Sequence, residues 1–194
     1  MTRSTAVRLL LAILALAALA ACALGGQTSS MAFRSFTVEG GPVQFNLRGT
    51  GPVEWTGRVT VKGGGLTLTA DDGLKLWPTA DRRDAERVEA KGNVTVEGQY
   101  LAADRTRWDF TSKADAASYE RTSGQGVMRG SVTFRAANAA TGAVLSASAD
   151  KLIYSFKTQQ FRFERGDKPV RMEWQEPAPP AAQPAPESKE ATGK

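Results

Sequence analysis

Three aspartates close similar stretches of sequence, and their repetition is the first feature that could indicate chemistry. They are Asp71 in Leu-Thr-Ala-Asp, Asp104 in Leu-Ala-Ala-Asp and Asp150 in Ser-Ala-Asp. Carboxylates are ligands that hard divalent cations prefer, so a metal site is one interpretation. Aspartate at the end of a strand also hydrogen-bonds backbone N–H groups and starts turns. We favour this structural role and predict no metal site.

Histidine is absent from the chain. Its absence excludes Ser-His-Asp and Cys-His nucleophile systems, histidine-based zinc sites and the usual general base near neutral pH. Carboxylate-only chemistry remains possible, but no pair of acids is distinguished by its position. We therefore predict that the protein is not an enzyme, has no catalytic residue and uses no cofactor.

The single cysteine, Cys22, lies near the end of an apolar segment at the N-terminus. The first eight residues include two arginines, and the run from Leu9 to Leu24 carries no charge. This run is shorter than the roughly 20 residues of a membrane-spanning helix and fits the hydrophobic part of a signal peptide. We predict that residues 1–21 are a signal peptide and that the protein is exported to the periplasm.

The quartet Leu19-Ala20-Ala21-Cys22 resembles the bacterial lipobox, in which the cysteine is lipidated and becomes the new N-terminus. This resemblance implies that Cys22 carries a lipid that anchors the protein to a membrane. Ordinary cleavage after Ala18-Leu19-Ala20 is the alternative, and it would leave Cys22 without a role.

Composition divides the remaining chain into a domain and two flanking segments. Residues 23–32 are small and polar and are predicted to be a flexible tether, whereas residues 175–194 are rich in proline and lack aromatic residues, as a disordered tail would. Residues 33–174 form the predicted domain. The net charge of +5 suits an anionic ligand or a membrane surface, but it is too small and evenly spread to indicate nucleic-acid binding.

The domain alternates apolar and polar residues with a period of two, as in Arg-Val-Thr-Val-Lys at 58–62 and Asn-Val-Thr-Val-Glu at 93–97. Such alternation predicts an all-β fold whose antiparallel strands bury one face. The apolar residues expected on the buried face are Val59, Val61, Leu66, Leu68, Val94, Val96, Leu101, Val132, Phe134, Leu152, Tyr154, Phe161 and Phe163.

The strands belong to repeated hairpin units. Units begin at Gly57, Gly92 and Gly130, each followed by a polar residue and then by Val-Thr-Val or Val-Thr-Phe, and the three aspartates end corresponding strands. A repeat of 20–50 residues indicates stacked supersecondary units. Since one unit cannot bury its apolar face alone, we expect the units to share an apolar interior.

The succession of G-x-V-T-V and L-x-A-D motifs between Pro52 and Phe163 resembles the OstA-like domain of lipopolysaccharide-transport proteins such as LptA and LptC. The resemblance implies a twisted, slightly open β-jellyroll whose interior slot holds lipid acyl chains, and members that pair end to end through unpaired strands. The Pro/Ala-rich tail fits LptA better than LptC. The lipobox departs from both, because LptA is usually released and LptC is usually held by a transmembrane helix.

On this resemblance we expect a periplasmic carrier of lipopolysaccharide or a related amphipathic lipid, with the buried apolar residues as its lipid-binding residues. Its expected partners are the lipid, other OstA-like proteins or further copies of itself, and the membrane that holds its N-terminal anchor. The alternative is a structural module of the cell envelope that has a dry core and pairs with partners through its strand edges.

Overall fold

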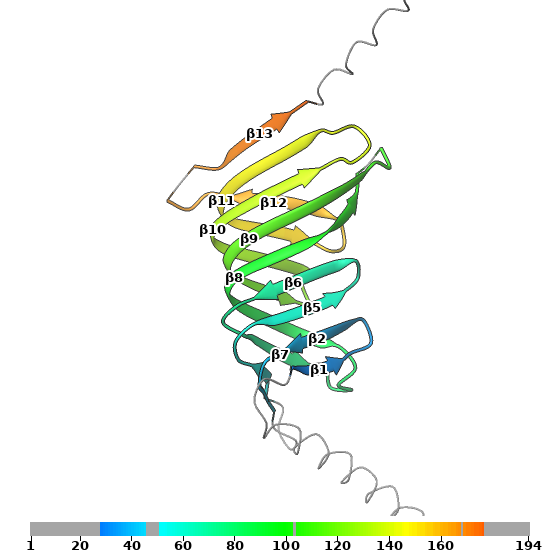
Figure 1. Ribbon diagram of the computed structural model, residues 1–194, viewed down its shortest axis with the longest axis vertical. Coiled ribbons are helices and arrows are strands. Elements are labelled where there is room, and N and C mark those ends of the chain that lie inside the picture. The colour runs from blue at the N-terminus through cyan, green and yellow to red at the C-terminus, as the bar shows by residue number, and fades with distance from the viewer. Residues whose placement is uncertain (1–27, 46–50, 103, 168, 177–194) are drawn as a thin grey trace, which may run out of the picture.

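The computed structural model describes residues 28–45, 51–102, 104–167 and 169–176. The predicted signal peptide, Cys22 and all but the first two residues of the predicted tail lie outside them. The described residues fold into antiparallel strands and turns, as Figure 1 shows. No helix in this part of the chain is long and apolar enough to cross a membrane.

Thirteen strands form one hydrogen-bonded sheet. They are β1 Ser29–Ala32, β2 Phe36–Gly40, β3 Val43–Gln44, β4 Val53–Trp55, β5 Val59–Gly63, β6 Leu66–Ala70, β7 Leu74–Pro78, β8 Ala85–Leu101, β9 Arg107–Glu120, β10 Gln125–Ala137, β11 Val144–Ser155, β12 Gln160–Glu164 and β13 Arg171–Gln175.

The sheet is folded over on itself into two layers, because the long strands β8 to β11 each run through both. The first layer contains β1, β2, β5, β6 and β13, with the C-terminal halves of β8 and β10 and the N-terminal halves of β9 and β11. The second layer contains β3, β4, β7, β12 and the other halves of the long strands. This arrangement confirms the predicted all-β, slightly open jellyroll.

Glycines mark the bends between the layers. Gly92 and Gly130 have φ angles of 77° and 79°, and the strand register shifts at both positions. Such φ values are strained for residues with a Cβ atom. A Cβ would also collide with the Asp72 carboxylate at Gly92 and with the Asp115 carboxylate at Gly130. The repeated glycine is therefore the residue that lets a strand pass from one layer to the other.

The pairing register corrects the alignment of the repeat. Asp115, within β9, takes the position that the sequence alignment assigned to Asp104. Asp104 instead lies in the turn between β8 and β9, where it accepts hydrogen bonds from the backbone N–H and the hydroxyl of Thr106. In every unit the valine two positions after the glycine pairs with the alanine directly before the aspartate: Val59 with Ala70, Val94 with Ala114, and Val132 with Ala149.

The folded domain begins earlier than the sequence suggested. Residues 29–32, placed in the flexible tether, form β1 and pair with β2, and Met31 packs against the core. The hydroxyl of Ser29 donates a 2.7 Å hydrogen bond to the backbone oxygen of Gly41. The segment was predicted to be a tether because most of its residues are small or polar. In β1, however, Met31 points inward.

Candidate functional site

Each layer presents a continuous row of inward-facing residues that crosses the whole domain. In the first layer the row is Val38, Val61, Leu68, Val96, Ser112, Phe134, Ala147 and Met172. In the second layer it is Val53, Leu76, Val88, Tyr119, Gly126, Tyr154 and Phe161. The space between the rows is the candidate site.

Twelve of the thirteen residues expected on the buried face lie in this interior or beside its cavity. Leu101 is the exception, since its side chain is 55% exposed at the end of β8. Val94 and Val96 point inward, so the period of two also turns Tyr100 inward and Leu101 outward. The expectation for Leu101 was wrong because it followed hydrophobicity instead of this parity.

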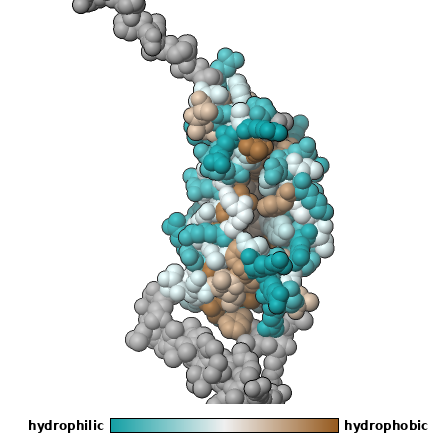
Figure 2. Space-filling model, turned by 90° about the vertical axis from the view of Figure 1, so that its right-hand side faces the viewer, coloured by the Kyte–Doolittle hydropathy of each residue, from teal (hydrophilic) through white to brown (hydrophobic). Residues whose placement is uncertain are grey.

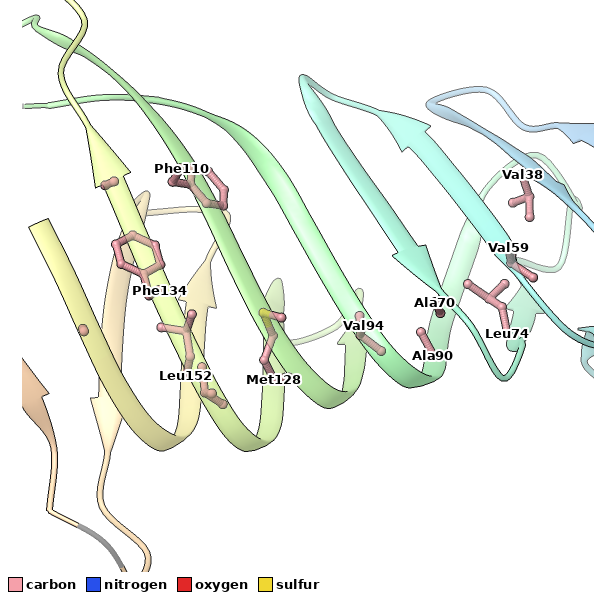
Figure 3. Packing of buried hydrophobic residues seen from close by; sticks show 14 of the residues in the cluster. Val38, Val59, Ala70, Leu74, Ala90, Val94, Phe110, Met128, Phe134 and Leu152 are labelled. Atoms are coloured by element: carbon pink, nitrogen blue, oxygen red, sulfur yellow. The ribbon is translucent and has the colours of Figure 1, made fainter. Parts of the chain in front are cut away.

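The interior is sealed at the bends and more open on the opposite side. Figure 3 shows Val94 beside the bend of its strand and Phe110 farther away, and Val94 is fully buried. Leu66 and Phe161, near the hairpin ends, are only half-buried. On the side where hairpin turns of the first layer lie, Figure 2 shows residues of hydrophobic and intermediate hydropathy along the centre, between hydrophilic borders. The interior thus has the form of a slot with a mouth.

A small apolar cavity of about 60 Å³ lies within the slot. It exists because two positions in the facing rows have little or no side chain: Gly126 in the second layer and Ser112 in the first. The Ser112 hydroxyl is turned to the backbone, where it donates a 3.1 Å hydrogen bond to the oxygen of Thr133. The other lining residues are Leu66, Val96, Phe110, Met128, Leu152, Tyr154, Phe156 and Phe161.

Aromatic rings connect the two layers around the cavity. Phe161 of the second layer lies 4.8 Å from Phe134 and 5.2 Å from Phe110 of the first layer, measured between ring centroids. Tyr154 lies 4.7 Å from Phe161 and 4.8 Å from Phe156. Burial raises the pKa of the Tyr154 phenol, as expected for a group in apolar surroundings. Neutral, apolar surfaces therefore line this part of the slot.

Phe110, Met128, Gly126 and Phe156 also line the cavity and were not among the residues expected to bind lipid. Phe110 could have been found from the alternation of Trp108 and Phe110 on one face of β9. No local signal marks Gly126, since its contribution is the space it leaves opposite Ser112.

Asp71, Asp104 and Asp150 each contact residues close to them in the fold. No group of three or more potential ligands converges anywhere in the described residues. Asp71 lies 3.8 Å from Arg58 and accepts a hydrogen bond from Asn93, whereas Asp150 accepts one from the backbone N–H of Gly166. These contacts, with those of Asp104, agree with the structural role that we favoured.

Comparison with protein families identifies the fold. Residues 47–160, more than half of the chain, match the model of the LptA/(LptD N-terminal domain) LPS transport protein family. The chain belongs to this family. The match extends from before β4 to the start of β12 and so includes all three repeat units. A comparison with curated protein sequences gives no match.

A solved structure shares the family fold. The chain is similar to LptH from Pseudomonas aeruginosa, described as the LptA-homologous periplasmic component of the lipopolysaccharide transport device, with a TM-score of 0.55 and 17% identity. The similarity covers 73% of this chain and 96% of LptH. This likeness concerns the jellyroll fold, and together with the family match it confirms the resemblance to OstA-like domains.

Proposed function

We propose that this family member is a periplasmic carrier that holds the acyl chains of lipopolysaccharide, or of a related envelope lipid, between its two layers. The observation that carries the proposal is the apolar slot, which is sealed at the bends, open along the hairpin ends and incompletely filled beside Gly126. The description of the family and the periplasmic location of LptH support the same role.

The energetics favour acyl chains as the bound groups. Each methylene that leaves water contributes about 0.8 kcal/mol, so a chain of a dozen contributes up to about 10 kcal/mol. The cavity of about 60 Å³ accommodates roughly four to six water-sized groups, which is less than a whole chain. Binding therefore requires the mouth to widen, and the half-buried rings of Tyr154 and Phe161 are the parts of the lining that can move.

Photocrosslinking from neighbouring positions of one strand tests the lipid's location. Val96 lines the cavity, whereas Thr95 on the same strand faces outward. With a photoreactive residue at each position in turn, lipid adducts are expected from position 96 alone. Adducts at neither position, with a core that excludes a hydrophobic fluorescent probe, would instead favour the dry structural module.

We also propose that the domain joins partners through its unpaired strand edges. Among the described strands, β1 pairs only with β2 at one end of the first layer, and β13 pairs only with β11 at the other. Such edges invite strand addition, and repeated head-to-tail contacts build open filaments. Sedimentation of the domain without its tail should show assembly that increases with concentration; a monomer at every concentration would contradict edge pairing.

Membrane anchoring through lipidated Cys22 completes the proposed arrangement. Since β1 begins at Ser29, a lipid on Cys22 would hold the domain close to the membrane. Mass spectrometry of the mature N-terminus should find acyl groups on the wild-type protein, and Cys22→Ala should release the protein into the soluble fraction. Unmodified wild-type protein would support ordinary cleavage. The match to LptA-type proteins supports an LptA-like role over an LptC-like one.

A further inference from the structure

The outer face of the first layer is hollowed opposite the aromatic end of the slot. A depression of about 650 Å³ crosses β9, β10, β11 and β13, and smaller hollows adjoin it. The side chains around it alternate with inward-facing residues such as Phe134 and Ala147, so this surface is separate from the apolar interior.

Hydroxyl groups line the middle of this hollow, in two adjacent rows set by the strand register. Thr133 and Ser148 pair directly in one row, and Thr111 and Ser146 flank Arg135 in the other. The outward-facing residues that line the hollow include no aromatic ring and no long aliphatic side chain. Its surface therefore suits a ligand that is rich in hydroxyl groups and has no apolar part.

Three cationic side chains surround the hydroxyls: Lys113, Arg135 and Arg171. Lys113, Thr133, Ser148 and Arg171 form one row across four strands, which spans about 14 Å at ordinary strand spacing. The only acid in the lining is Glu173. Within this lining, three cations therefore outnumber one acid.

Two cations on the outer face of the second layer are neutralised by neighbouring acids. There, Lys75 pairs with Glu54 at 3.0 Å and Arg162 pairs with Glu164 at 2.7 Å. Within the described part of the chain, Lys113, Arg135 and Arg171 take part in no ion pair or side-chain hydrogen bond. Their charges are available to an anion from outside, and both guanidinium groups can bind phosphate in a bidentate manner.

We propose that this hollow is a binding site for a phosphorylated saccharide, with phosphate on Lys113, Arg135 and Arg171 and sugar hydroxyls on the Thr/Ser rows. Either a lipid headgroup or a saccharide without acyl chains supplies this chemistry. The site stands independently of the proposed acyl binding, because the sheet separates the two surfaces.

Binding of a deacylated, phosphorylated oligosaccharide prepared from lipopolysaccharide tests the site by calorimetry. The double variant Lys113→Gln/Arg171→Gln should lose at least about tenfold in affinity, because it removes two of the three charged donors that would contact phosphate. Lys75→Gln/Arg162→Gln removes the same charge from the other outer face and should bind within about twofold of the wild type. Thermal unfolding checks that both variants are folded.

Three further measurements decide whether the hollow binds a phosphorylated saccharide. The dephosphorylated oligosaccharide should bind far more weakly, and equal binding would overturn the proposal. If only intact lipopolysaccharide binds, and the Lys113/Arg171 variant weakens that binding, the ligand is a lipid headgroup. Equal loss in both double variants would show a general charge effect and refute the site. Lipid crosslinking from position 96 should be unchanged in the Lys113→Gln/Arg171→Gln variant. This result separates failure of the outer-face site from failure of the slot.

Discussion

The two ends of the interior differ in the kind of side chain that fills them. At the N-terminal end, Val38, Val59, Leu74 and Leu76 are at most 2% exposed. At the C-terminal end the interior is filled by aromatic residues, and Phe156 remains 42% exposed. Compact packing of these aliphatic side chains with the buried ring of Trp55 gives the first end a closed core, whereas the second has partly exposed rings and a cavity beside them. We therefore predict that the first end contributes most of the stability and that the acyl chains of the proposed ligand bind at the second.

Shortening a buried side chain at the closed, N-terminal end of the interior should have the largest effect on stability. Leu76→Ala removes a fully buried side chain, and such substitutions cost about 2–5 kcal/mol. Denaturant unfolding should show this loss, while the refolded variant should still form lipid adducts from position 96. Loss of adducts in a folded Leu76→Ala protein would mean that the two ends do not divide these tasks.

The bends between the two layers occur along the whole interior. Disrupting one of them should have the second-largest effect on stability. Gly130→Ala places a Cβ at a positive φ and against the Asp115 carboxylate, so we expect a loss of about 1–3 kcal/mol. Asp115→Ala in the same chain should recover the part of the loss that arises from the collision. Equal unfolding midpoints for Gly130→Ala and the wild type would show that the bend tolerates a side chain.

Filling the cavity should affect binding more than stability. A Cβ at Gly126 would lie 3.3 Å from Cε2 of Phe156, whose exposed ring has room to yield. Gly126→Val should therefore fold with a free energy of unfolding within about 1 kcal/mol of the wild type but yield several-fold fewer adducts from position 96. A matched change at Gly51, where a Cβ meets nothing within 4 Å, should leave the adducts unchanged.

The smallest effect concerns alkaline pH. Burial raises the pKa of Tyr100, Tyr119 and Tyr154 above the usual value, and the chain has no other tyrosine. A raised folded-state pKa stabilises the protein below the unfolded pKa, near 10, and this contribution is lost as the pH rises through the folded value. Tyr154→Phe should therefore weaken the fall in unfolding midpoint above pH 10. Absorbance at 295 nm follows the ionisation, and an unchanged pH profile would contradict the prediction.

Local patterns were sufficient for the all-β class and for most of the residues that line the slot. Period-two alternation identifies the inward residues Val94 and Val96 because a strand turns successive side chains to opposite faces. The glycine that opens each repeat was visible, but its function was not, because a bend between layers looks like a turn in sequence. Asp104 was mistaken for Asp115 because short motifs can be aligned at several offsets, and only the pairing of β8 with β9 selects one.

By itself, the sequence determined that this protein is a repeated β-structure without histidine chemistry, with a shared apolar interior and a family resemblance that the comparisons confirm. These properties depend on residue type and spacing along one strand. Tertiary structure decided that the long strands pass through two layers, that Gly126 and Ser112 leave a cavity, and that Lys113, Arg135 and Arg171 surround one hollow. Such features join residues from different strands, so they depend on pairing register, which the sequence of any single strand does not contain.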